Sequence, residues 1–170
     1  MKRTKWIERK FGIIEDNGLL PAIIERLEGT PVRLQKKIKN IDEDKLNKKS
    51  DGKWSIKEEI GHLSDLEPLW IERVEQIVIG LPEMKPADIT NPQTHNANHN
   101  SKNVLDILNK FALLRNQLVE RLRTFHDDDL LKASIHPRLK TPMKIIDLAF
   151  FVAEHDDHHL AQIHFLITSN

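Results

Sequence analysis

Apolar residues recur every three or four positions over four long stretches of the chain, which is the spacing of one face of an amphipathic α-helix. The first stretch covers residues 21–40, where Gly29, Thr30 and Pro31 predict a break or a kink because proline removes a helical hydrogen bond. Four such helices are typical of an all-α four-helix bundle, which we expect to be of the antiparallel type. The pattern predicts helices over residues 21–40, 55–79, 103–125 and 141–167.

Capping signals and breakers set the limits of these helices. Ser55 and Glu58 have the spacing of a capping box, in which each side chain binds the backbone amide of the other residue. Thr141 is a suitable N-cap before Pro142, whose missing N–H is not needed in a first turn. Residues 80–102 contain three prolines and many asparagines and are predicted to form a long loop without a helix. We expect this loop to lie over or beside a functional site and to be less ordered than the helices.

Length, charge and composition narrow the class of protein. The 170 residues suit a single domain over residues 1–170, with the bundle core at about 21–167. The 26 basic and 26 acidic residues balance, and no basic run is long enough to follow a phosphate backbone, so no nucleic-acid partner is expected. The absence of cysteine excludes thiolate metal ligands and a cysteine nucleophile, and it suits a cytoplasmic protein. No apolar run is long enough for a membrane span, and no membrane partner is expected.

Histidines interrupt the apolar stripe of the last predicted helix. His155 and His159 lie on or beside the stripe, and their spacing of four residues places their Cβ atoms about 5–6 Å apart, close enough to bind one metal ion. His158 is rotated further round the helix and is expected to flank the pair, and His164 is expected on the surface. The alternative for the pair is two ordinary core histidines, since this short pattern also occurs by chance.

A third ligand is available in the second predicted helix. His62 lies beside apolar residues, and three imidazoles from two facing helices would leave the open coordination positions that catalytic sites keep. The alternative for His62 is an ordinary histidine at the edge of the core. Glu58, one turn before His62, is better explained by the capping box than by a role in orienting His62 or moving a proton. Asp65, three residues after His62, either supports that histidine or is a solvated carboxylate.

The other histidines are weaker candidates for a functional role. His95 and His99 lie in the asparagine-rich loop and are better explained as solvated residues than as parts of a lid over the pocket. His126 and His136 have no evident partner and are assigned no role. The residue pattern identifies no catalytic residue.

Two segments resemble the DinB/YfiT-like superfamily, and most closely its DinB-like helical-bundle branch. Residues 54–65, WSIKEEIGHLSD, are similar to a family segment on the second helix that spaces tryptophan, serine or threonine, glutamate, histidine and aspartate in this way. Residues 155–163, HDDHHLAQI, are similar to the two-histidine segment of the last helix. The similarity covers about residues 21–167, and it is specific because both segments occur in order within four helices of the expected lengths.

The resemblance implies a divalent metal, commonly nickel or zinc, held by three histidines that correspond here to His62, His155 and His159. It also implies a homodimer, because known members are often dimeric. Characterised relatives are metal-dependent transferases that join low-molecular-weight thiols to electrophiles, or proteins that have been classed as hydrolases. A small molecule is therefore the expected substrate, and the transferase case implies a low-molecular-weight thiol.

The leading hypothesis is a metal-dependent enzyme that activates a thiol or water for transfer to a small electrophilic substrate. Its alternatives are a metal-dependent hydrolase, a non-enzymatic metal-binding or stress-induced bundle, and a bundle whose histidines are structural and bind no metal. We expect metal binding to weaken as the pH falls through about 6.5, the ordinary pKa of histidine, because protonated imidazoles cannot bind metal.

Overall fold

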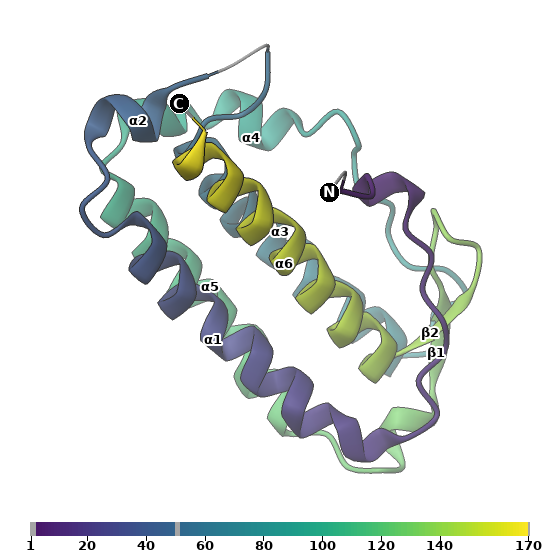
Figure 1. Ribbon diagram of the computed structural model, residues 1–170. Coiled ribbons are helices and arrows are strands. Elements are labelled where there is room, and N and C mark those ends of the chain that lie inside the picture. Colours follow the sequence, from purple (N-terminus) through teal and green to yellow (C-terminus); the bar gives the residue numbers. More distant parts are fainter. Residues whose placement is uncertain (1–2, 50–51, 170) are drawn as a thin grey trace.

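The computed structural model describes residues 3–49 and 52–169 and confirms a mostly helical four-helix bundle (Figure 1). None of the helices within these residues is long and apolar enough to cross a membrane. The bundle consists of α1 (Leu20–Ile38), α3 (Ile56–Val78), α5 (Val104–Arg123) and α6 (Ile145–Thr168). The shorter elements are α2 (Glu43–Asn47), α4 (Pro92–Asn96) and 3₁₀ turns at Trp6–Glu8, Asn17–Leu19, His99–Ser101 and Asp129–Leu131.

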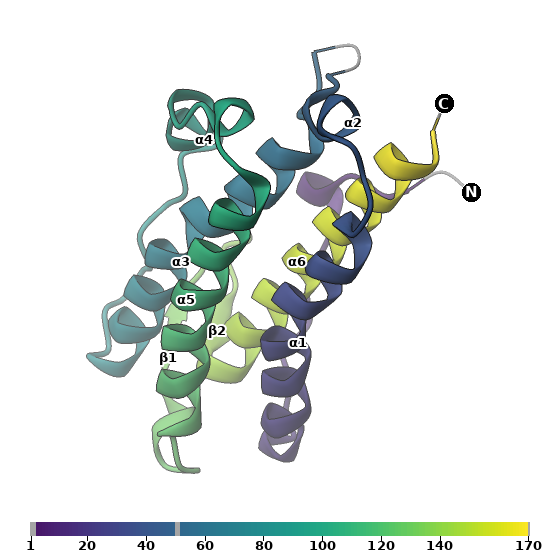
Figure 2. The same ribbon diagram turned by 90° about the vertical axis from the view of Figure 1, so that its left-hand side faces the viewer.

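The helices α1 and α3 lie at opposite corners of the bundle, and each packs against both α5 and α6. The pairs α1 and α6, and α3 and α5, run in the same direction, whereas the other packed pairs are antiparallel (Figures 1 and 2). An ion pair between Arg121, near the end of α5, and Glu75, near the end of α3, agrees with this parallel pairing. The expectation of an antiparallel bundle is therefore corrected for two packed pairs. These pairs are parallel because residues 80–102 return along the bundle, so that α5 begins at the same end as α3.

The predicted break in the first helix does not end it. Helix α1 continues from Leu20 to Ile38 with Pro31 in its interior. Proline leaves the carbonyl four residues earlier without its helical partner. That carbonyl, of Leu27, instead accepts a hydrogen bond from Arg115 Nη1 at 3.2 Å. A long-range contact thus supplies what the helix itself lacks.

The last helix begins later than predicted, because Pro142 belongs to a strand. The strands β1 (Ala133–Ile135) and β2 (Pro142–Lys144) form an antiparallel hairpin that places Ser134 opposite Met143. Three-residue strands are too short for a periodic pattern, so the hairpin was not predicted. Helix α6 starts at Ile145, where the Asp147 carboxylate accepts the N–H of Lys144 at 2.9 Å.

The segment 80–102 is tied to the hairpin and contains helical turns, which corrects the prediction of a loop without a helix. Met84 donates its N–H to the carbonyl of Ile135 at 3.0 Å, and Ile135 donates to the carbonyl of Pro82 at 2.9 Å. Helix α4 and a 3₁₀ turn follow within the same segment. The return connection is thus held against the bundle.

The core has two apolar clusters, one toward each end of the bundle. Trp70 and Phe151 belong to the cluster nearer the hairpin, and Leu63 and Phe111 belong to the other. Val32, an apolar residue of α1, is exposed and belongs to neither cluster. Between the clusters lies a layer of buried polar side chains, described below.

Candidate metal centre

The packing of α3 against α6 brings His62 together with His155 and His159. One ring nitrogen from each histidine lies within 4.8 Å of the other two, and all three side chains are buried. The ring centroids are 5.4 Å apart for His62 and His155, 4.9 Å for His62 and His159, and 4.5 Å for His155 and His159. The three predicted ligands therefore converge, and their binding of a metal stays a prediction.

Hydrogen bonds orient two of the three rings. His159 Nδ1 lies 2.5 Å from Glu59 Oε2, and His62 Nδ1 lies 3.1 Å from Thr94 Oγ1. A carboxylate accepts, so the proton of His159 is assigned to Nδ1 and its Nε2 is left with a lone pair. The same arrangement, in which the second ring nitrogen is held by a carboxylate or hydroxyl, is typical of metal-binding histidines.

The donor set fits a divalent ion that prefers nitrogen ligands, such as zinc or nickel. His155 Nε2 lies 3.1 Å from His159 Nε2, so a cation beside them is within reach of both lone pairs. His155 Nδ1 is buried without a hydrogen-bond partner among the described residues. No cysteine competes for the ion, because the chain has none.

Burial keeps the imidazoles of His62 and His155 neutral. Loss of hydration, and then the neighbouring His159, His99 and His95, lower the pKa of His62 to about 2. Loss of hydration likewise lowers the pKa of His155 well below its ordinary value. The neutral imidazole is the form that binds metal. In the folded protein, proton competition at these two ligands therefore begins well below the pH of 6.5 expected from the sequence.

The lowered histidine pKa values predict that the metal-free protein loses stability in mild acid. The pKa is lowered to about 2 for His62 and to about 3 for His136, in each case chiefly by burial, whereas the unfolded chain binds protons near pH 6.5. The free energy of unfolding is therefore highest with respect to these histidines above about pH 6.5. Below that pH it falls by about 1 kcal/mol per pH unit for each buried neutral histidine. Urea unfolding at pH 7.5, 6.0 and 5.0 measures this loss.

Two substitutions provide the comparison for that measurement. His62→Gln is expected to flatten the pH dependence, because it removes one group that the fold keeps neutral. His164→Gln, at an exposed position as predicted, is expected to leave the dependence unchanged. A free energy of unfolding that stays constant between pH 7.5 and 5.0 would contradict the lowered pKa values.

His158 flanks the other three histidines, as predicted. Its half-buried ring lies 5.4 Å from that of His159 and 5.9 Å from that of Trp6. Burial, His159 and the arginines of the N-terminal segment lower its pKa to about 4. Its ring nitrogens are not part of the converging group.

His99 is not the solvated loop residue that the sequence favoured. It is 4% exposed, and its Nε2 lies 2.8 Å from Asp65 Oδ2. Its ring packs on Gly61, where an added Cβ would lie 2.4 Å from the ring atoms, so only glycine fits. Asp65 therefore fastens the 80–102 segment to α3 and forms no hydrogen bond with His62. His95, by contrast, is exposed, 5.9 Å from the ring of Trp54.

The carboxylate that contacts the histidine cluster is Glu59, which the sequence did not single out. Glu58 forms the predicted capping box: Ser55 N donates to its Oε2 at 2.9 Å, and its own N–H is 3.2 Å from Ser55 Oγ. Glu59 lies three residues before His62, so the two share a helix face. The spacing of Glu59 and His62 could have identified Glu59 from the sequence. The capping box at Glu58 instead drew attention to the neighbouring carboxylate.

The histidines line one wall of a cavity of about 360 Å³. Residues 86–89 and Asn91 of the connection between α3 and α5 form another wall, which confirms the predicted position of this segment beside the site. Its lower order stays a prediction. Trp6 and Ile7 of the N-terminal segment also line the cavity, together with Trp54 and Trp70, so all three tryptophans of the chain border it.

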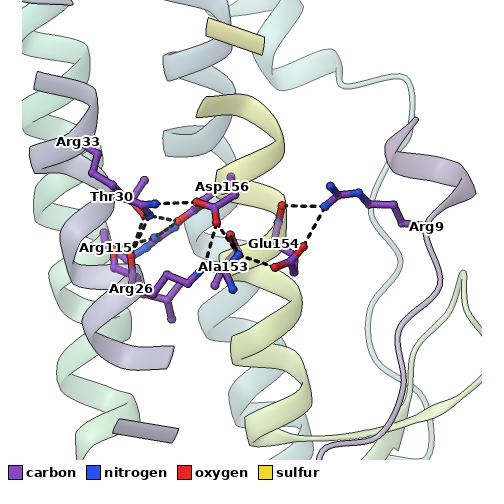
Figure 3. Close-up of polar contacts among 10 residues, drawn as sticks. Arg9, Arg26, Thr30, Arg33, Arg115, Ala153, Glu154 and Asp156 are labelled. Carbon is purple, nitrogen blue, oxygen red and sulfur yellow. Dashed lines mark hydrogen bonds and ion pairs between the residues drawn. The ribbon is translucent and has the colours of Figure 1, made fainter. Parts of the chain in front are cut away.

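A buried polar layer joins the four long helices behind this site (Figure 3). Arg115 of α5 bonds Glu67 of α3 through Nη2 at 2.6 Å and Asp156 of α6 through Nη2 at 3.0 Å. Thr30 of α1 donates to Asp156 at 2.8 Å. Because Asp156 directly follows His155, these contacts fix the rotation of α6 that turns its histidines toward α3.

The N-terminal segment is held to the same helix. Figure 3 shows Arg9 reaching Glu154, and Arg9 Nη1 lies 3.1 Å from Glu154 Oε2. Ile14 donates its N–H to Asp147 at 2.7 Å. The ring of Trp6, which lines the cavity, packs edge-on against His155 at 5.0 Å. The segment therefore forms part of the wall of the site.

A four-helix bundle with a buried three-histidine group beside an open cavity defines the class of this protein. The family model described as the DinB superfamily matches residues 26–163, and the chain belongs to that superfamily. The fold is similar to that of YfiT from Bacillus subtilis, described as "a probable metal-dependent hydrolase with an unusual four-helix bundle topology". The TM-score is 0.79 at 22% identity, covering 94% of this chain and 91% of that one. A comparison with curated proteins gave no significant match.

Proposed function

We propose that this protein is a metal-dependent enzyme in which His62, His155 and His159 bind one divalent ion, zinc or nickel. The observation that carries the proposal is the convergence of three buried ring nitrogens within 4.8 Å on the wall of a cavity. A purely structural site would be closed, whereas three ligands beside a cavity leave room for a substrate. The description of YfiT as a probable metal-dependent hydrolase agrees with this reading.

When bound, such an ion supplies Lewis-acid activation, lowering the pKa of a thiol or water so that it attacks an electrophile at neutral pH. Glu59 holds the proton of His159 on Nδ1, and Thr94 steadies His62, so that the ring nitrogens facing the site stay available. Trp70 and Phe151 give the cavity apolar walls that exclude water and bind an apolar part of the substrate.

Two reactions follow from this site. Transfer of a low-molecular-weight thiol to an electrophile is the first, and the thiol must come from a substrate because the chain has no cysteine. Hydrolysis by an activated water is the second, favoured by the description of YfiT. A homodimer in the cytoplasm is part of the proposal and rests on the resemblance and on the cysteine-free composition.

The proposal is tested by metal analysis followed by activity measurements on untagged protein. We expect about one zinc or nickel ion per chain, removable by a chelator, and turnover of a thiol with an aryl halide electrophile, or of an activated ester, that is lost and regained with the metal. Metal uptake without turnover on either panel would favour a metal-sequestering bundle. No uptake at neutral pH would contradict the proposal and favour structural histidines.

A further inference from the structure

A second polar group lines the cavity and has no part in the reaction proposed above. Arg73 follows His62 by eleven residues on α3, which is three helical turns or about 16 Å along the axis, and both residues line the cavity. His136 and Arg138, which follow strand β1, line it as well. The cavity therefore runs from the three histidines at one end to two arginines and a histidine at the other.

Hydrogen-bond donors face one another in this group. His136 Nδ1 accepts the N–H groups of Arg138 and Leu139, each at 3.2 Å. A neutral imidazole that accepts at Nδ1 carries its proton on Nε2, which assigns the tautomer from the hydrogen bonds. His136 Nε2 lies 3.3 Å from Arg73 Nη1, which is also a donor. An acceptor oxygen placed beside both atoms would satisfy them.

The two arginines are unusual because no carboxylate forms an ion pair with either among the described residues. Arg73 is 1% exposed, and its Nε donates to the carbonyl of Lys85 at 2.9 Å. Arg138 Nη1 donates to the carbonyl of Ile7 at 3.0 Å, and its Nη2 is buried without a partner among those residues. Burial, and then the charge of Arg138, lower the pKa of Arg73 to about 10.

One carboxylate, that of Asp88, also borders the cavity. It is exposed and accepts the N–H of Thr90 at 2.9 Å and its hydroxyl at 2.7 Å. The Asp88 carboxylate therefore stabilises a turn within its own segment. A buried cation without a partner is costly unless an anion compensates it, so two cations on one cavity wall favour an anionic ligand.

We propose that Arg73, His136 and Arg138 bind an oxyanion group of the substrate, a carboxylate or a phosphate, whose reacting end lies at the three histidines. Arginine suits this role because its planar fork matches the oxygens of both groups. The inference deepens the proposed function and rests on it for the position of the reacting end. The substrate class is a small, elongated molecule with an anionic end.

Aromatic rings line the cavity between its two ends. The Trp70 ring centroid lies 5.3 Å from the guanidinium carbon of Arg73 on one side and 5.7 Å from the His155 ring on the other. The guanidinium of Arg138 lies 5.8 Å from the Trp6 ring and 5.9 Å from the Phe151 ring. The middle of the substrate is therefore apolar or aromatic.

The test uses the intrinsic fluorescence of the three tryptophans that border the cavity. Chelator-treated protein is titrated with arylalkyl carboxylates, with arylalkyl phosphate monoesters of matched length, and with the corresponding neutral primary amides. We expect saturable binding of the anionic series and about 10–100-fold weaker binding of the amides, because charge-assisted hydrogen bonds are lost. The stronger of the two anionic series identifies the oxyanion.

Variants connect the binding to these residues. Arg73→Met and Arg138→Gln are each expected to weaken anion binding about tenfold or more. Arg121→Gln, which removes a partly exposed arginine on another helix, is the matched control and is expected to bind as the unaltered protein does. Arg138 is less buried than Arg73, so Arg138→Gln decides the question if Arg73→Met does not fold.

Two results would overturn the inference: equal affinity for acids and amides, or unchanged anion affinity in Arg138→Gln. Anion binding that appears only after zinc loading and is equal in the arginine variants would place the anion at the histidines, leaving the proposed function intact. Anion binding by a protein that takes up no metal would instead support this subsite and contradict the proposed metal chemistry.

Discussion

Replacing His159 with alanine is expected to abolish most metal binding, whereas replacing His158 is expected to weaken it by at most about 10–100-fold. His159 places Nε2 3.1 Å from His155 Nε2, so the alanine variant removes one of three converging nitrogens. His158 only packs against the edge of this group, with its ring at 90° to that of His159. Titration of both metal-free variants with zinc, in competition with a chromogenic chelator, measures the two affinities.

Glu59→Gln is an intermediate case in the same titration. Glutamine keeps an acceptor oxygen for the Nδ1 proton of His159 but removes the negative charge that makes the imidazole a better ligand. We expect a loss smaller than that of His159→Ala. If His158→Ala loses metal as completely as His159→Ala, the assigned ligand set is incorrect, because the geometry leaves His158 outside it.

Arg115→Met is expected to destabilise the protein by about 3–5 kcal/mol, because it leaves two buried carboxylates without their cation. Arg115, Glu67 and Asp156 are at most 1% exposed. Burial already raises the pKa of Glu67 even though Arg115 opposes the shift. The substitution also frees the Leu27 carbonyl beside Pro31, so it removes support from α1 as well. Urea unfolding at pH 7.5 measures the change in the free energy of unfolding.

The matched control is Arg121→Met, which breaks a partly exposed pair with Glu75 and is expected to cost about 0–1 kcal/mol. A second variant replaces Arg115, Glu67 and Asp156 together with apolar residues of similar size. It should recover much of the loss, because no buried charge is left unpaired. A cost below about 1 kcal/mol for Arg115→Met would contradict this account of the polar layer, since a buried cation with two carboxylate partners cannot be so weakly coupled.

Helix positions and the histidine pair were predictable because they depend on local spacing. Periodicity located the four long helices to within a few residues, apart from the start of α6, where the strand β2 replaced the expected first turn. Ser55 and Glu58 formed the expected cap, since both partners lie within one helical turn. His155 and His159 share a face for the same reason, and the apolar residues around His62 indicated which side of α3 faces the core.

Contacts between distant segments were decided by packing. The parallel direction of α3 and α5 follows from the path of residues 80–102, which places Thr94 and His99 against α3. Pattern alone could not choose among neighbouring carboxylates, because one residue along a helix is a rotation of about 100°. Only the position of α6 showed that Glu59, and neither Glu58 nor Asp65, contacts the histidine cluster.

The same distinction applies to the group formed by Arg73, His136 and Arg138. His136 had no evident partner in the sequence, because it is 63 positions from Arg73. The two side chains meet only when the hairpin packs against α3. Local hydrogen bonding and hydrophobic periodicity, which act over a few residues, thus specify the helices and which residues share a helix face. The cavity and the charges that line it arise from side chains that become neighbours only when the helices, the hairpin and the returning connection pack together.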